Sequence, residues 1–133
     1  IQYIRQGKTQ NATIVLDDVE IKAVPFFSLL KDNTGYIVLT KFTEKASFET
    51  KAALLELKKQ GATKIILDLR GNPGGLLHEA VNICNLFVPK NELIVTTKSK
   101  NPKHNLEYRT KNEPIDLEIP IAVIVDGKSA AAS

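Results

Sequence analysis

The sequence predicts an α/β domain with a largely parallel sheet. Three short apolar runs, at residues 36–39, 64–69 and 121–125, have the composition of strands. The segments between the first two runs and after the second carry apolar residues at three- and four-residue spacing, which is typical of helices. A chain in which strands alternate with helices favours a parallel sheet, because each parallel connection needs a crossover.

The first predicted strand and helix lie in residues 36–60. Tyr36-Ile37-Val38-Leu39 is a continuous apolar run, which predicts a strand covered on both faces. Residues 43–60 then show helical periodicity. We expect Thr43 or Ser47 to cap the start of this helix and Gly61 to end it in the left-handed conformation.

The second predicted strand, at 64–69, is followed by a glycine-rich turn and another helix. The turn covers residues 70–75 and the helix covers about 76–87. We expect Asp68, at the end of the strand, to hold the turn by accepting hydrogen bonds from backbone N–H groups.

The last part of the chain predicts a hairpin and a further strand. Residues 94–97 and 105–110 are less apolar and predict two more exposed strands, with His104 at the tip between them. Residues 121–125 predict a third buried strand that ends at Asp126-Gly127.

The amino-terminal residues predict a separate hairpin. Residues 1–5 alternate apolar and polar, 6–10 have the composition of a turn, and 12–16 predict a second strand. A lone hairpin is marginally stable in water, so we expect it to be the end of a domain that begins earlier. Residues 17–25 would then be a linker.

Composition excludes several classes of function. The net charge of +3 is small and the lysines are dispersed, which argues against a nucleic-acid partner. No apolar run approaches the length of about 20 residues that a membrane-spanning helix needs. Cys84 is the only cysteine, so no internal disulfide is expected, and its apolar flanks predict a buried thiol. No spacing of metal ligands is evident, and we expect no cofactor.

Two segments follow predicted strands at the edge of the sheet where α/β proteins bind ligands. The turn at 70–75 contains paired glycines, which let backbone N–H groups face an anion or a developing oxyanion. A tight turn without function is the alternative. Residues 127–133 follow the other strand. His78, one turn beyond the glycines, could border a peptide groove, although an exposed helix residue is the simpler interpretation.

These segments carry a resemblance to a known family. Residues 66–76, Ile-Leu-Asp-Leu-Arg-Gly-Asn-Pro-Gly-Gly-Leu, resemble the signature of the C-terminal processing peptidases, or tail-specific proteases. Residues 35–42 resemble the strand that opens their core, and residues 120–133 resemble their last strand and nucleophile turn. The resemblance implies a serine peptidase with a Ser-Lys dyad and a core of the ClpP/crotonase-like type.

The resemblance also implies a division of the chain. Residues 1–25 resemble, more loosely, the closing hairpin and linker of a substrate-recruiting PDZ domain. Residues 26–133 would be the first part of the catalytic core, which stops before the catalytic lysine.

The nucleophile turn of the family reads Gly-Ser/Thr-Ala-Ser-Ala-Ser-Glu, and its middle serine attacks. In this chain Ala131 occupies the nucleophile position and Lys128 stands in the glycine slot. The resemblance implies an oxyanion hole made by the amide of Ala132 and that of Gly74 or Gly75. An alanine methyl group cannot attack a carbonyl, so this chain is expected to be inactive.

Ala131 leaves two explanations open. One is a deliberate replacement of serine, which the intact glycine turn favours, and the other is a natural pseudoenzyme that binds peptides. A crotonase-type acyl-CoA enzyme would share the fold, but it does not account for the Ser-Ala-x-Ala-Ser run at 129–133. The resemblance implies polypeptide substrates with a free C-terminus and an extracytoplasmic or periplasmic location, and it leaves assembly into a homo-oligomer open.

Overall fold

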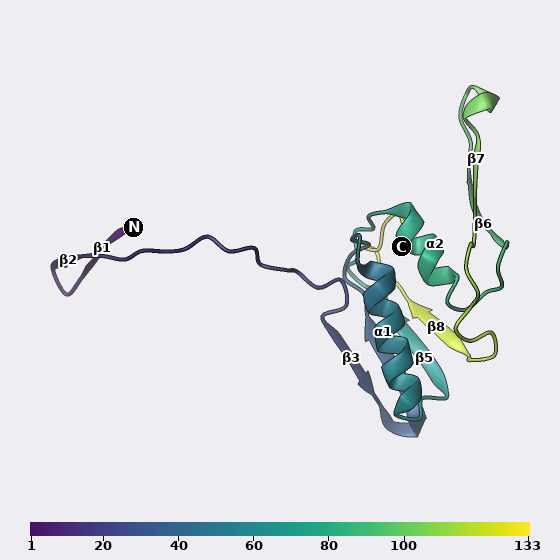
Figure 1. The fold of residues 1–133 in the computed structure, drawn as a ribbon, viewed down its shortest axis with the longest axis horizontal. Coiled ribbons are helices and arrows are strands. Elements are labelled where there is room, and N and C mark those ends of the chain that lie inside the picture. Colours follow the sequence, from purple (N-terminus) through teal and green to yellow (C-terminus); the bar gives the residue numbers. More distant parts are fainter.

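A four-stranded mixed sheet forms the core of the computed structural model, which describes residues 1–133 (Figure 1). Its strand order is β3-β4-β5-β8. The first pair is antiparallel, and the two other pairs are parallel. The strands are β3 (Phe26–Leu29), β4 (Thr34–Val38), β5 (Lys64–Asp68) and β8 (Ile121–Ile124). The sheet is therefore largely parallel, as predicted, with the unpredicted strand β3 at one edge.

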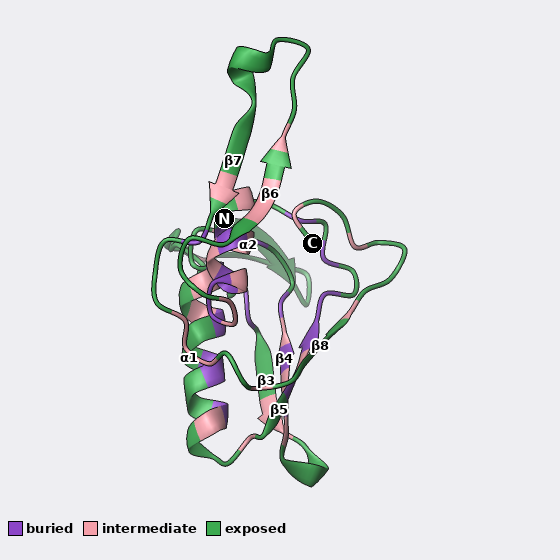
Figure 2. Ribbon diagram, turned by 90° about the vertical axis from the view of Figure 1, so that its right-hand side faces the viewer, coloured by how far each residue is buried: buried purple, intermediate pink, exposed green.

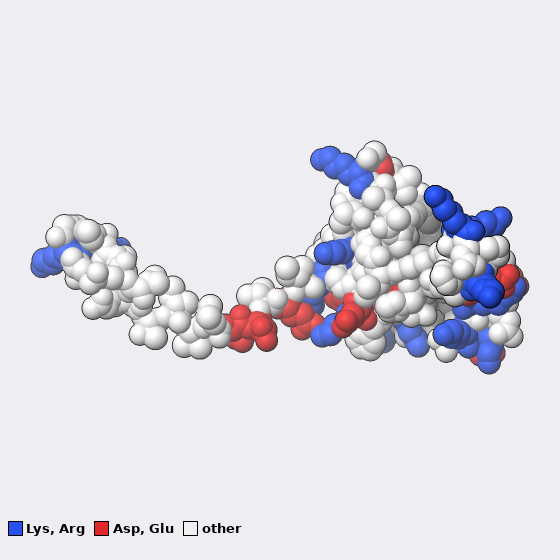
Figure 3. Space-filling model, turned by 90° about the horizontal axis from the view of Figure 1, so that it is seen from above, with Lys and Arg blue, Asp and Glu red and all other residues white.

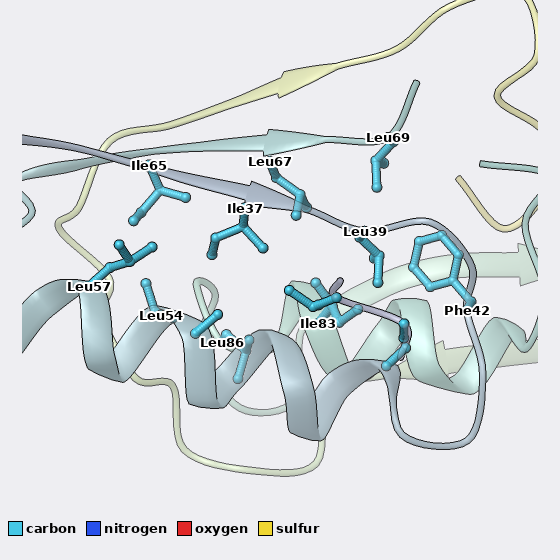
Figure 4. Close-up of a cluster of buried hydrophobic side chains, with 14 residues drawn as sticks. Ile37, Leu39, Phe42, Leu54, Leu57, Ile65, Leu67, Leu69, Ile83 and Leu86 are labelled. Atoms are coloured by element: carbon cyan, nitrogen blue, oxygen red, sulfur yellow. The ribbon is translucent and has the colours of Figure 1, made fainter. Parts of the chain in front are cut away.

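Two helices lie on one side of this sheet. The long helix α1 (Ala46–Lys59) packs along the sheet, and α2 (Leu77–Cys84) packs against α1 (Figure 1). A 3-10 turn, η1 (Lys31–Asn33), joins β3 to β4. The main core lies between α1 and the sheet (Figure 4), where the side chains are 2% exposed or less, as for Ile37, Leu39, Leu54, Leu57 and Ile65.

The prediction that the strands are covered on both faces is wrong for β4. Ile37 is fully buried, whereas its neighbours Tyr36 and Val38 are only half-buried. The reason is that α1 covers a single face of the sheet, as the alternation of burial along β4 shows (Figure 2). A continuous apolar run such as residues 36–39 therefore does not by itself show that a strand is covered on both faces.

Residues 121–125 are also predicted to form a buried strand, and the prediction that this strand is buried is wrong. The strand exists, but Val123 is 53% exposed and Val125 is 57% exposed. β8 is the edge strand, pairs with β5 alone, and lies beyond the strands that α1 covers. Its apolar side chains therefore have few partners among residues 1–133.

The start of α1 is stabilised by a residue from another helix. Thr43 does not begin the helix, and its hydroxyl accepts only a long hydrogen bond of 3.4 Å from the Lys45 amide. The amide of Ser47 donates to the buried carboxylate of Glu79, on α2, at 2.7 Å. A carboxylate at a helix N-terminus is favourable for the free amides there. The helix ends as predicted, since Gly61 has φ +99°.

The predicted hairpin near the carboxyl end is confirmed. It consists of β6 (Leu93–Thr97) and β7 (Leu106–Arg109), with the 3-10 turn η2 (Pro102–His104) at its tip. The hairpin projects away from the sheet in Figures 1 and 2. Helix α2 is shorter than predicted, because the chain leaves helical geometry for a series of turns after Cys84.

The amino-terminal hairpin differs from its prediction. β1 (Gln2–Arg5) pairs with β2 (Lys8–Asn11), and residues 12–16 form no strand. The physical reason is the turn: Gln6 and Gly7 both have positive φ, at 51° and 73°, which allows a two-residue loop. Residues 12–22 run without a sheet partner to the core (Figure 1), and Leu16 is 96% exposed.

Charged side chains are spread over most of the chain, with uncharged stretches such as residues 9–16. In Figure 3 the acidic side chains of the linker stand near the core, and lysine and arginine side chains form several separate groups on the core and hairpin. Neither α1 nor α2 combines the length and apolar character that crossing a membrane requires.

Candidate active site

The glycine-rich turn at 70–75 connects β5 to α2 and touches the chain at two points where only glycine fits. A Cβ on Gly74 would lie 1.5 Å from the carbonyl oxygen of Ala131, and one on Gly75 would lie 2.4 Å from that of Phe42. Both glycines have positive φ, at 97° and 143°. Backbone bonds join Phe42 to this turn on both sides, from its amide to the Gly74 carbonyl at 3.0 Å and from the Leu76 amide to its carbonyl at 2.9 Å.

Asn72 connects three segments at the centre of this site. Its side chain is fully buried; Nδ2 donates to the Leu39 carbonyl at 2.8 Å, and Oδ1 accepts from the Gly74 amide at 2.8 Å. Its own carbonyl accepts from the Ala130 amide at 3.0 Å and from the Ser133 hydroxyl at 3.1 Å. One residue therefore ties the end of β4, the glycine turn and the segment after β8 together. Sequence reasoning missed this role.

The structure brings the glycine turn and residues 127–133 together, as expected for the carboxyl ends of adjacent parallel strands. The Leu69 amide donates to the Ile124 carbonyl at 2.8 Å, and the Ser129 hydroxyl donates to the Leu69 carbonyl at 2.7 Å. These bonds fix where the second segment lies over the first.

Ala131 lies directly over the glycine turn. Its carbonyl accepts from the Gly75 amide at 3.3 Å, and the residue itself is exposed. The Gly74 amide is buried and donates to Asn72, whereas Gly75 is exposed and its amide points at the Ala131 carbonyl. The amide of Ala132 donates to no protein acceptor. Two backbone donors thus lie close to the Ala131 position, an arrangement that suits the binding of an oxyanion.

Asp68 holds the start of the glycine turn, as predicted. Its Oδ1 accepts from the Arg70 amide at 3.0 Å, and its Oδ2 forms an ion pair with Arg70 Nη2 at 2.7 Å. The hydroxyl of Tyr36 donates to the same carboxylate from β4. The Arg70 guanidinium, with a smaller contribution from Tyr36, holds the pKa of Asp68 well below its usual range, and the hydrogen bond to Asp68 raises the pKa of Tyr36.

This cluster predicts an acid-sensitive stability. The pKa of Asp68 is lower in the folded chain than in the unfolded chain, so its bonds stabilise the fold fully above about pH 4 and progressively less as the pH falls. We expect Asp68→Asn to lower the free energy of unfolding at pH 7 and to flatten its decline from pH 5 to pH 3, as measured by urea denaturation. Parallel curves for the two proteins would contradict this assignment.

The other polar candidates make no hydrogen bond to the glycine turn. His78 is exposed on the first turn of α2 and borders a groove of about 560 Å³ between α2 and β7. His104 is at the hairpin tip, as predicted. Cys84 is half-buried and not fully buried as predicted, because it lies at the last residue of α2, and its partial burial raises the pKa of the thiol. No group of three or more histidine, cysteine or acidic side chains is arranged to hold a metal ion.

Comparison with known proteins places this geometry in a family. Residues 33–133 match the model of peptidase family S41. The chain belongs to peptidase family S41. The S41 match covers the sheet from β4 onward, both helices, the glycine turn and the segment that contains Ala131.

Curated relatives of this S41 chain carry the name "Probable CtpA-like serine protease". The chain is 33% identical to such a protein from Staphylococcus saprophyticus over 129 residues and 34% identical to one from Staphylococcus epidermidis over 131 residues. Both alignments include 97% of this chain but only 26% of the relative, so the chain spans about a quarter of their length.

Solved structures share its fold. The photosystem II D1 C-terminal processing protease superposes with a TM-score of 0.69 at 25% identity, over 93% of this chain and 35% of that one. An S41 protease from Bacteroides fragilis gives a TM-score of 0.68 at 23% identity, over 93% of this chain and 36% of that one. The predicted resemblance to the C-terminal processing peptidases is confirmed.

Proposed function

We propose that the protein carrying this chain is a serine endopeptidase that cleaves other proteins near their C-termini, with residue 131 as the position of the nucleophile. The S41 family match and the names of the relatives support the class of reaction. The observation that carries the assignment of the site is the 3.3 Å hydrogen bond between the Gly75 amide and the Ala131 carbonyl. It sets residue 131 beside the paired glycines.

The proposed chemistry assigns a role to each part of this site. A serine hydroxyl at position 131 attacks the scissile carbonyl, and a lysine outside these 133 residues takes its proton. The amides of Gly75 and Ala132 then donate to the oxyanion of the tetrahedral intermediate. Because the Gly75 amide donates to Ala131 here, the Ala131 carbonyl has to turn away before that amide can bind the oxyanion. With alanine at position 131, no covalent step can occur.

Restoring the hydroxyl tests this proposal. In the longest form of the protein that the gene encodes, we expect Ala131→Ser to produce cleavage of a denatured protein substrate and labelling by a fluorophosphonate probe. The Ala130→Ser variant adds the same hydroxyl one residue away and is expected to give neither. Cleavage by Ala130→Ser, or by the protein with Ala131 unchanged, would contradict the assignment of the nucleophile.

A natural pseudoenzyme that binds peptides is the second candidate, and Ala131 itself is the observation that favours it. The two proposals differ at the codon that encodes residue 131, where a serine codon in the natural gene supports the peptidase and an alanine codon supports the binder. If Ala131→Ser stays inactive while peptide binding is measurable by calorimetry, the binder is the better description.

The finer assignments are part of the same proposal. Residues 1–25 would close a PDZ domain that recruits substrates by their free C-termini, which fits a hairpin whose strands pair only with each other. The location would be outside the cytoplasm, by analogy with the family. Both assignments rest on the resemblance, and removing the recruiting domain is expected to weaken substrate binding.

A further inference from the structure

Asp126 lies in the turn that directly follows β8 and accepts several backbone hydrogen bonds through one carboxylate oxygen. Its Oδ1 accepts from the amides of Lys128 and Ser129 at 2.9 and 3.1 Å, both within its own turn. The same oxygen accepts from the Gly71 amide at 3.0 Å. This last bond crosses from the segment that contains Ala131 to the glycine turn, 55 residues away in sequence.

A second cross-link runs beside the first. The Ser129 hydroxyl accepts from the Asp126 amide at 3.0 Å and donates to the Leu69 carbonyl at 2.7 Å. Asp126 therefore organises its own turn and, with Ser129, ties that turn to both ends of the segment from Leu69 to Gly71. None of these contacts involves Ala131, Ala132 or Gly75.

The position of these bonds links them to the proposed chemistry. Residue 131 lies two residues beyond Ser129, and the Gly75 amide lies four residues beyond Gly71. A shift of one turn against the other changes the distance between nucleophile and oxyanion donors. An error of about 1 Å in such a distance can cost about a hundredfold in rate.

We propose that Asp126 is a positioning residue, which holds the nucleophile turn in register with the oxyanion-binding glycine turn through its bond to the Gly71 amide. This inference rests on the proposed peptidase function. A carboxylate suits the role because hydrogen bonds to an ionised acceptor are stronger than those between neutral groups. The hydrogen bond from the Gly71 amide, followed by that from Lys128, lowers the pKa of Asp126, so the carboxylate stays ionised at neutral pH.

Three substitutions at this position separate the contributions, each made in the longest encoded form with Ala131→Ser. Asp126→Asn keeps the Oδ1 acceptor and should keep kcat within about threefold. Asp126→Ser keeps an acceptor for its own turn but is too short to reach Gly71, so kcat should fall about tenfold to a hundredfold with little change in KM. The kcat of Asp126→Ala should fall at least as far as that of Asp126→Ser. Asp18→Ala, an exposed acid in the linker, controls for the lost charge.

A second measurement does not depend on activity. Amide hydrogen exchange in the protein with Ala131 should be faster at Gly71 in Asp126→Ser than in Asp126→Asn, while the amides of β5 are unchanged. If Ala131→Ser is inactive, the proposed function fails, but the exchange at Gly71 still tests the link between the turns. Equal exchange at Gly71 in all variants, or equal kcat for Asp126→Ser and Asp126→Asn, would overturn the inference.

Discussion

Replacing Asn72 with alanine is expected to lower the free energy of unfolding by about 2–6 kcal/mol, because two buried backbone groups lose their partners. These groups are the Leu39 carbonyl and the Gly74 amide, both of which bond to the Asn72 side chain at 2.8 Å. Each buried polar group left unpaired costs about 1–3 kcal/mol. Urea denaturation of the variant and the parent protein measures the difference.

The same substitution should reduce activity beyond its effect on stability. In the Ala131→Ser background we expect kcat to fall at least about a hundredfold at a temperature where the variant is still folded, since the glycine turn loses its internal support. Asn11→Ala, on an exposed strand of the separate hairpin, is the control and should change stability by less than about 0.5 kcal/mol. A loss at Asn72 as small as that of the control would show that water replaces both bonds.

Gly74→Ala is expected to displace the segment that contains Ala131. The new Cβ would lie 1.5 Å from the Ala131 carbonyl oxygen and 2.5 Å from the Ala132 nitrogen, and these are backbone atoms that cannot rotate aside. In the Ala131→Ser background, we expect the loss of at least about a hundredfold in kcat/KM. Backbone NMR shifts should change at residues 129–133 more than in β4 or β5.

Gly61→Ala provides a matched control for the backbone conformation. Gly61 has φ +99°, close to the +97° of Gly74, but no atom lies within 4 Å of the Cβ position. The control should therefore lose about 1 kcal/mol of stability from the strained φ and keep its activity. If both variants lost activity equally, the cause would be the strained backbone and not the contact with Ala131.

The elements that local pattern predicted correctly are those with strong periodicity and clear boundaries. β5 and both helices fall within the predicted ranges, β4 begins two residues before its predicted start at Tyr36, and Gly61 ends α1 in the predicted conformation. The glycine turn and the run at 129–133 were recognised because their residue types are constrained by close backbone contact. Close backbone contact leaves room only for small residues, so the sequence shows glycine and alanine at these positions.

Other features could not be read from local pattern. Strand β3 was missed because its four residues lack clear alternation and follow a proline. Because the turn at Gln6-Gly7 is only two residues long, β2 begins at Lys8 and not at the predicted residue 12. Residues 12–16 therefore lie outside any sheet, although their apolar composition is typical of a strand. Composition indicates whether a segment can form a strand, whereas the length of the turn decides which residues of two strands pair.

The sequence by itself determined the α/β class, the order of the main elements and the two motifs that mark the S41 family, because each depends on residue type and short spacing. Only the tertiary structure decided which groups hold the site together. Asn72 donates to the carbonyl of Leu39, Asp126 accepts from the amide of Gly71, and Glu79 caps a helix other than its own. Such bonds form only after parallel strands have brought separate segments to the same edge of the sheet.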